Sequence, residues 1–222
     1  NQEKKEEKSR NNLVECERFL YSILVVGFHV QLEIIQNKNA KFFQNGANAV
    51  EFFFLVSGYF MARSIEKINS KEKPEIFLDS LYFLKNKIKS ILPTHIASNV
   101  IMIIIILIVR KPQWDKTLLN GLPGLFLVQM AVVWNGSYVL AINNPEWYIS
   151  TLLLGMLFIV PISLLLRKKM KLLFVVLLHV IFISLIAVIA GCITKCSLPD
   201  NFANDIRGWL EMCLGMFAFC LS

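Results

Sequence analysis

Metal-ligand patterns and sequence repeats are missing from this chain. The five cysteines are scattered, and neither they nor the three histidines have the spacing of a metal site. There is also no internal repeat and no low-complexity region. These absences give no support to a metal centre. They also give none to a transporter, because many transporters are built from inverted repeats.

Apolar residues are too abundant for a typical soluble domain. They make up 55% of the 222 residues, against about 45–50% in soluble domains. Several apolar runs have about 20 residues, the length that crosses the roughly 30 Å hydrocarbon core of a bilayer. The sequence therefore predicts an integral membrane protein. The net charge of +7 is then better explained by basic residues on the cytoplasmic side than by nucleic-acid binding.

Six segments are expected to cross the membrane as helices. They are 14–36, 49–64, 91–109, the stretch from NPEWYIS to Leu166, 172–191, and an unfinished segment from about Ile206. The expected fold is an all-α, polytopic bundle of about six transmembrane helices. We expect residues 1–13 to be a charged cytoplasmic tail rather than a cleavable signal peptide, and residues 14–222 to be the transmembrane domain. The chain starts at Asn1 and stops within an apolar segment, so we expect it to be incomplete at the C-terminus.

Two further segments need separate interpretation. In 75–90 the apolar residues lie on one helical face and the lysines mostly elsewhere, which favours an interfacial amphipathic helix. The alternative is that 75–90 is the cytosolic end of the next helix. The apolar segment 117–134 is broken by two glycines and a proline, and we expect it to be re-entrant or interfacial. If the N-terminus is cytoplasmic, a re-entrant or interfacial 117–134 places both the seven Lys/Arg of 63–89 and the RKKMK cluster on the cytoplasmic side.

The first apolar segment contains two costly polar groups, Arg18 and His29. They are eleven residues apart, which is almost three turns, so they share a helix face. At about 1.5 Å per residue they are about 16 Å apart along the axis and cannot touch. An ionisable residue within a membrane segment indicates a functional site by default. The pair therefore suggests a polar stripe along that face.

Each of these residues also has a structural interpretation. Arg18 could extend to the membrane interface, and His29 could form a hydrogen bond between helices. Glu33 or Glu51 could orient the imidazole of His29, or both could be solvated at the interface. We interpret the other two histidines, His95 and His179, as packing or interfacial residues.

Five motifs in the right order resemble the acyltransferase 3 family of membrane acyltransferases. They are an Arg followed eleven residues later by His, then NAVEFFFLVSGYFMARS, FLKNKIKSILP, LFLVQMAVVW with NPEWYIS, and RGWLEMCLGMFAF. The resemblance covers nearly all of the chain. Family members have about ten membrane helices, which agrees with a missing C-terminal part.

The third motif departs from the family pattern. Where the family often has paired arginines before the proline, this chain has Lys87 and Ser90, with Lys89 alongside. Lysine cannot make the bidentate contact of arginine with phosphate. Glu51 stands where many members have aspartate, which keeps the charge.

The resemblance implies a function for the residues at each end of the bundle. Such an enzyme moves an acyl group, commonly acetyl, from cytoplasmic acyl-CoA to a hydroxyl of an extracytoplasmic or lipid-linked glycan. It implies a bacterial plasma-membrane protein with a cytoplasmic N-terminus, no bound cofactor, and acyl-CoA as co-substrate. His29 is the expected general base and Glu51 its catalytic partner. The expected substrate-binding residues are Arg18, Lys85, Lys87, Lys89, Ser57, Trp147, Tyr148 and Arg207.

Several of these residues have a second interpretation. Ser57 could be a nucleophile, but no basic partner is near it in sequence, and its neighbour Gly58 is better explained by close helix packing. Trp147 and Tyr148 could belong to an interfacial aromatic belt, and Arg207 could be an interfacial anchor. At the level of function, the alternatives are a transporter or flippase subunit and a non-catalytic membrane anchor.

Overall fold

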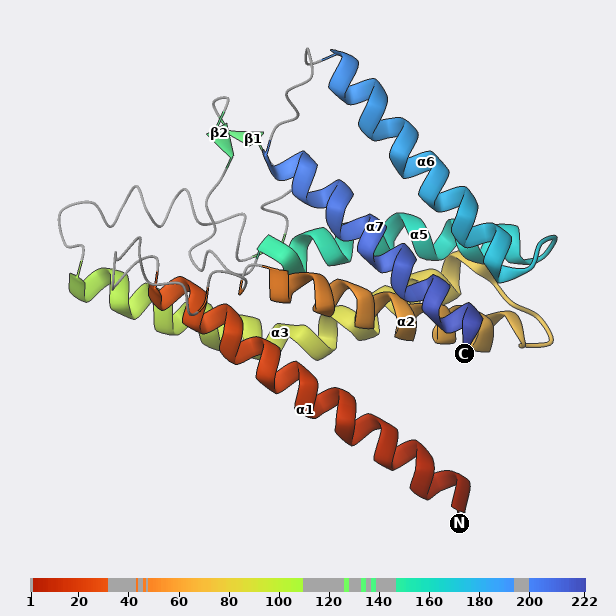
Figure 1. Cartoon of the computed structure of the whole chain (residues 1–222), viewed down its shortest axis with the longest axis horizontal. Coiled ribbons are helices and arrows are strands. Elements are labelled where there is room, and N and C mark those ends of the chain that lie inside the picture. Colours follow the sequence, from red (N-terminus) through yellow and green to blue (C-terminus); the bar gives the residue numbers. More distant parts are fainter. Residues whose placement is uncertain are drawn as a thin grey trace.

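A computed structural model describes residues 2–31, 43, 46, 48–109, 126–127, 133–134, 137–138, 147–193 and 200–222. Its helices are α1 (Gln2–Val30), α2 (Ala49–Asn69), α3 (Ile76–Val109), α5 (Trp147–Arg167), α6 (Leu172–Ile193) and α7 (Asp200–Leu221). Two short strands, β1 (Val133–Trp134) and β2 (Ser137–Tyr138), pair antiparallel. The described part therefore confirms the all-α class, with one two-residue pairing added (Figure 1).

Three of the described helices are long and apolar enough to cross a bilayer. They contain the spans Ile76–Ile105, Trp147–Arg167 and Leu172–Cys192. The other described helices are less apolar; α2, for example, includes Glu51, Arg63 and Glu66. A membrane protein is thus supported, and a total of six crossings stays a prediction.

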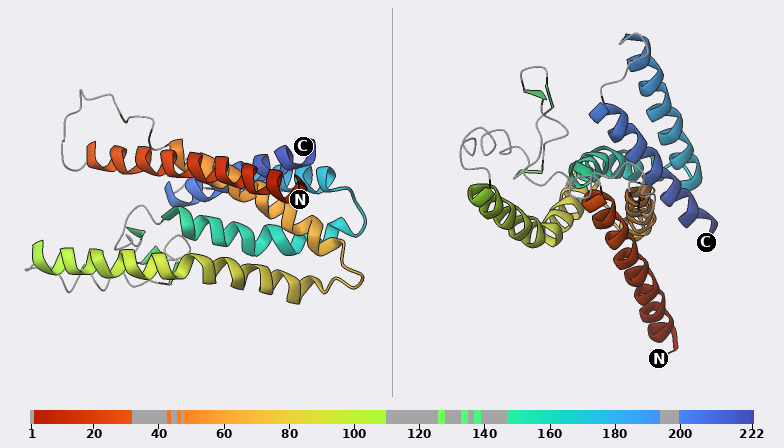
Figure 2. Two further views of the ribbon diagram at one scale, coloured as in Figure 1. Left: turned by 90° about the horizontal axis from the view of Figure 1, so that it is seen from below. Right: turned by 60° about the vertical axis from the view of Figure 1, so that its left-hand side comes forward.

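One predicted segment differs in the structure. Residues 76–109 form one continuous helix, α3, so 75–90 is not a separate interfacial helix but leads into the next helix. Pro93 lies inside α3 and removes one backbone hydrogen bond, which bends a helix without ending it (Figure 2, right). Helix α1 begins at Gln2 and so includes most of the charged tail; the division of the chain at residues 13 and 14 stays a prediction. Most of the predicted re-entrant segment 117–134 lies outside the described residues.

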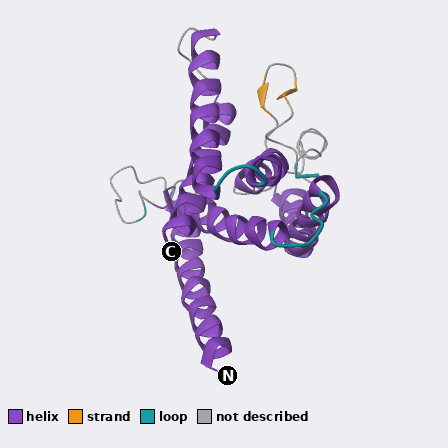
Figure 3. Cartoon of the chain, turned by 90° about the vertical axis from the view of Figure 1, so that its right-hand side faces the viewer, coloured by secondary structure: helices purple, strands orange, loops and turns teal. Residues whose placement is uncertain are grey.

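The helix surfaces expose many large apolar side chains. On α6, Phe174, Ile181 and Leu185 are more than half exposed. Figure 3 shows the C-terminal part of α6 and the N-terminal half of α1 projecting from the bundle in opposite directions. Exposed apolar surfaces of this extent are unfavourable in water and favourable against lipid. The packing therefore agrees with a bundle surrounded by acyl chains.

One end of the bundle is rich in basic residues. The α2–α3 and α5–α6 connections meet there (Figure 2, left), and Arg167 joins them through hydrogen bonds from Nε and Nη2 to the two carboxylate oxygens of Glu66, at 2.7 and 3.2 Å. We call it the basic end; its cations are Lys67, Lys71, Lys73, Arg167, Lys168, Lys169 and Lys171. The first residues of α2, α5 and α7 lie at the opposite end.

The centre of the bundle is the contact between α2 and α7, which run in the same direction. This contact is the most extensive in the described fold. A Cβ atom added to Gly58 would lie 2.0 Å from the backbone oxygen of Met212. One added to Gly215 would lie 1.9 Å from the backbone oxygen of Leu55. Glycine at both positions allows the two backbones to touch, which confirms the packing interpretation of Gly58.

Substituting either glycine is expected to separate α2 from α7. Gly58→Ala and Gly215→Ala should each lower the free energy of unfolding by at least about 1–3 kcal/mol, because the methyl group meets backbone atoms that cannot move aside. The measurement is the thermal unfolding midpoint of the purified protein in detergent. Gly191→Ala is the matched control, since nothing lies within 4 Å of its added Cβ. Equal midpoints for all three variants would contradict this account of the contact.

Candidate active site

The polar stripe predicted on the first helix lies on a partly buried face. Arg18, Tyr21, Val25 and His29 follow helical spacing and are all partly buried. Phe19, Leu20, Ile23 and Val26, which lie between them in sequence, are exposed. Val25 packs against the main core cluster, so this face of α1 is turned toward the bundle.

Arg18 is directed toward α2. Its guanidinium carbon lies 5.7 Å from the centre of the Phe60 ring, within the range of a cation–π contact. It also pairs with Glu15 one turn earlier, at 2.7 Å, and its side chain is 32% exposed. An arginine that only extended to the interface would not need the aromatic face of a neighbouring helix. The position of Arg18 therefore favours a role within the bundle.

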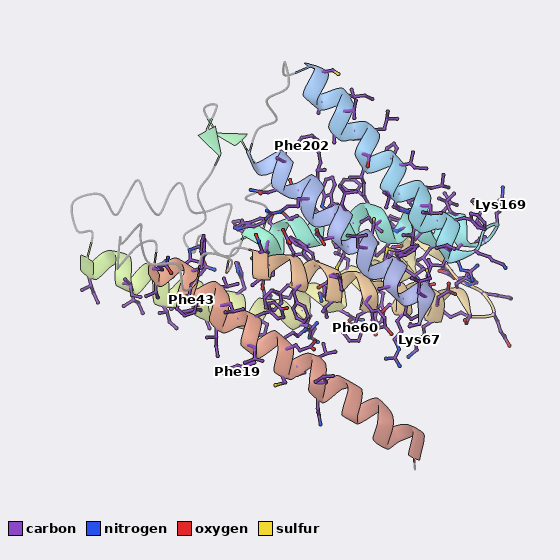
Figure 4. All side chains as sticks on the ribbon, in the orientation of Figure 1. Phe19, Phe43, Phe60, Lys67, Lys169 and Phe202 are labelled. Carbon is purple, nitrogen blue, oxygen red and sulfur yellow. The ribbon has the colours of Figure 1, made fainter. Side chains whose placement is uncertain are left out.

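A pocket of about 480 Å³ opens between α2 and α3 toward the basic end. Its charged lining residues are Lys67, Lys71, Asp79 and Lys87, and its uncharged polar ones are Ser57, Ser64, Tyr82, Asn86 and Ser90. Phe60, Met61 and Met156 add apolar surface. Figure 4 labels Phe60 and Lys67 along α2. We call this cavity the α2–α3 pocket.

Cations from three helices meet at this pocket. Phe60 lines it and also faces Arg18, and Arg18 is close enough to Lys87 for their like charges to interact. Lys71 forms an ion pair with Asp79, and the second carboxylate oxygen of Asp79 accepts a hydrogen bond from the Glu75 backbone at 3.0 Å. Lys67 and Lys87 therefore supply the excess positive charge of the lining, and Arg18, which is itself paired with Glu15, lies beside the pocket.

The lysines of α3 differ in their placement. Lys87 lines the α2–α3 pocket, as does Ser57, whereas Lys85 and Lys89 are exposed and do not line it. Sequence reasoning missed Lys67 and Lys71. Lys67 is in the last turn of α2, and Lys71 lies in the connection that follows the end of this helix at Asn69. Nothing in the sequence shows that both lysines face α3.

At the opposite end, residues from three helices gather around Arg207. Its Nη1 lies 3.9 Å from Oε1 of Glu51, and its guanidinium carbon lies 6.0 Å from the centre of the Trp147 ring. Glu211, one turn further along α7, interacts electrostatically with both Glu51 and Arg207. Tyr148 follows Trp147 and contacts the ring of Phe53 at 6.0 Å. We call Glu51, Trp147, Tyr148, Arg207 and Glu211 the Arg207 cluster.

The structure does not place Glu51 beside His29. Tyr21 stacks on Phe52, the neighbour of Glu51, with the two ring centres 4.1 Å apart. His29 is eight residues beyond Tyr21, about 12 Å further along α1. Within the described residues, the His29 ring makes an edge contact with the Phe28 ring, and the two ring centres are 5.5 Å apart. Glu33, the other predicted partner, lies outside the described residues.

A polar contact between α5 and α7 supports the Arg207 cluster. Asp205 is buried, and one of its carboxylate oxygens accepts a hydrogen bond from the Thr151 hydroxyl. Trp209 Nε1 donates to the Thr151 backbone oxygen at 3.0 Å. Since Arg207 lies between Asp205 and Trp209 in sequence, these bonds hold the segment of α7 that carries it. Sequence reasoning did not single out either bond.

The remaining histidines are buried, in agreement with packing roles. A ring nitrogen of His179 donates to the Val175 backbone oxygen at 2.7 Å, and His95 lies 3.2 Å from the side-chain nitrogen of Asn99. Within the part of the chain that the structure describes, no three His, Cys, Asp or Glu side chains form a group that could hold a metal ion.

Comparison with models of known protein families gives a match over nearly the whole chain. A family model described as an acyltransferase domain matches residues 14–221. The chain belongs to the acyltransferase 3 family. Searches of curated proteins and of solved structures found no match. The family and the apolar helices together support a membrane acyltransferase.

Removing the hydroxyl of Thr151 is expected to destabilise the α5–α7 contact. Thr151→Val leaves a buried carboxylate oxygen without its donor, which should cost about 1–3 kcal/mol of unfolding free energy. The unfolding midpoint in detergent measures this. Thr151→Ser keeps the hydroxyl and should retain most of the stability. A valine variant as stable as the serine variant would show that the bond is unimportant.

Proposed function

We propose that this acyltransferase moves an acetyl group from cytoplasmic acetyl-CoA to a hydroxyl of an extracytoplasmic or lipid-linked glycan. The observation that supports it best is the α2–α3 pocket, where Lys67 and Lys87 line a cavity with an apolar wall and Arg18 lies beside it against Phe60. Coenzyme A has phosphates at one end and a long, mostly uncharged arm at the other. A pocket with cations at its mouth and apolar residues inside suits that shape.

The basic end suggests how the chain is oriented across the membrane. Basic residues collect on the cytoplasmic side of membrane proteins, so we place the basic end in the cytoplasm of a bacterial cell and the chain in its plasma membrane as a multi-pass protein. The N-terminus is then cytoplasmic, and the α2–α3 pocket opens where acyl-CoA is available. The Arg207 cluster lies at the extracytoplasmic end, and we assign Glu51, Trp147, Tyr148 and Arg207 to the glycan acceptor.

In this proposal His29 is the general base. It takes the proton of the acceptor hydroxyl as the oxygen attacks the thioester carbonyl, so that a C–O bond forms and the C–S bond breaks. The imidazolium then returns the proton to the leaving thiolate, which departs as the free thiol of CoA. Base catalysis of this kind contributes about 10²–10⁴-fold to the rate. Arg18 holds the donor about 16 Å away along α1, at the cytoplasmic side.

The affinity for the acetyl-CoA donor should depend on which basic side chain is removed. Arg18→Ala, Lys67→Ala and Lys87→Ala should each weaken acetyl-CoA binding by about tenfold or more, because a charge-assisted contact with phosphate is worth about 1.5–3 kcal/mol. Lys85→Ala is the matched control from the same helix, and its affinity should stay within about twofold of the parent protein. Equilibrium binding to the purified protein measures this. An equal loss for Lys85→Ala and Lys87→Ala would contradict binding in the pocket.

Turnover should depend on His29 independently of donor binding. In membranes given radiolabelled acetyl-CoA, His29→Ala should lose about 10²-fold or more of the transfer of label to glycan. Its protein level and donor affinity should remain normal. Undiminished transfer would exclude His29 as the base. Movement of glycan across the membrane without label transfer would favour a transporter instead.

A further inference from the structure

The Arg207–Glu51 pair leaves a gap that another group can bridge. The 3.9 Å between Nη1 and Oε1 is longer than a direct hydrogen bond, which ends near 3.2 Å. Both side chains are partly exposed, 42% for Arg207 and 36% for Glu51. The pair therefore has unused donors on one side and unused acceptor lone pairs on the other.

A hydroxyl group satisfies both sides of this gap at once. Its oxygen accepts from the guanidinium while its hydrogen is donated to the carboxylate. A carboxylate or sulfate ligand can only accept, so it could use Arg207 and would face Glu51 without a shared proton. The geometry of the pair therefore discriminates between a neutral and an anionic ligand.

The charge of the Arg207 cluster also favours a neutral ligand over an anionic one. Glu51 and Glu211 are negative and Arg207 is the positive member, so the net charge of the cluster is negative. Glu211 adds no direct contact to the pair, but its carboxylate interacts with both partners. An anionic ligand beside Arg207 would be repelled by Glu51, whose Oε1 is 3.9 Å from the guanidinium, and by Glu211 one helical turn further along α7.

Aromatic rings complete a surface suited to a sugar. Trp147 lies against Arg207, and Tyr148 next to it packs on Phe53 and Phe54. Both Trp147 and Tyr148 keep part of their surface exposed. Aromatic faces pack against the apolar C–H face of a sugar, while charged side chains hydrogen-bond to its hydroxyls.

We propose that the Arg207 cluster binds an uncharged sugar, one hydroxyl of which bridges Arg207 and Glu51, and that Glu211 excludes uronic acids. This inference rests on the proposed function, because it names the class of acceptor. The acylated glycan is then neutral at the sugar that occupies this site.

Matched pairs of glycosides test this inference on the purified full chain. Methyl glucoside, galactoside and mannoside are each compared with the corresponding methyl uronide, which replaces the CH₂OH group by a carboxylate. Saturation-transfer NMR and competition measure binding. The neutral sugar of at least one pair should bind about tenfold more tightly than its uronide. Arg207→Ala should abolish binding of both members.

Glu211→Gln separates the charge effect from contacts. It keeps the size of the side chain and removes one negative charge. The ratio of neutral-sugar affinity to uronide affinity should therefore fall by about three- to fivefold, chiefly because the uronide binds more tightly. Glu72→Gln, an exposed acid in the α2–α3 connection at the basic end, is the matched control and should leave the preference unchanged. An unchanged preference in Glu211→Gln would overturn the role of that residue.

Donor binding in the same samples distinguishes the two proposals. Equal or tighter binding of the uronides, or no saturable binding of any neutral glycoside, would overturn this inference while normal acetyl-CoA binding left the proposed function standing. If the parent protein did not bind acetyl-CoA, that result would instead contradict the proposed function.

Discussion

The backbone contact between α2 and α7 is the constraint on which both polar regions depend. Gly58 and Gly215 let the two helices approach until backbone atoms of one meet Cα positions of the other. This contact sets the register of α7 along α2 and so brings Arg207 to Glu51. The same α2 contributes its far half to the α2–α3 pocket. A shift of α7 by one residue would remove the pairing at one end of the bundle.

The two polar regions differ in charge as their proposed ligands do. At the basic end, arginine and lysine side chains surround a cavity with apolar walls, which suits a phosphorylated carrier. At the opposite end, the excess charge is negative and aromatic rings lie beside it, which suits a polyhydroxylated ligand. His29 lies on the partly buried face of α1, about 16 Å from Arg18 along the helix. In the proposed function the two ligands would thus approach His29 from opposite ends.

Much of the local structure could be predicted from sequence because it depends on near neighbours. Helical spacing correctly placed Arg18 and His29 on one partly buried face, and the motif order correctly identified the family. The same reasoning treated Lys85, Lys87 and Lys89 alike, although only Lys87 lines the α2–α3 pocket. It also expected Glu51 near His29, whereas the structure pairs Glu51 with Arg207. Such differences depend on how helices rotate about their axes, which spacing alone does not specify.

By itself, the sequence determined the membrane class, the helical fold and the family, because apolar run length, periodicity and motif order are local properties of the chain. The tertiary structure alone decided which charges meet. Lys67 joins Arg18 and Lys87, Glu51 faces Arg207, and Asp205 accepts from Thr151, each across helices that are distant in the chain. The physical reason is that ion pairs and hydrogen bonds act over a few ångströms. Whether two distant residues come that close depends on helix packing, here on two glycines that let backbones touch.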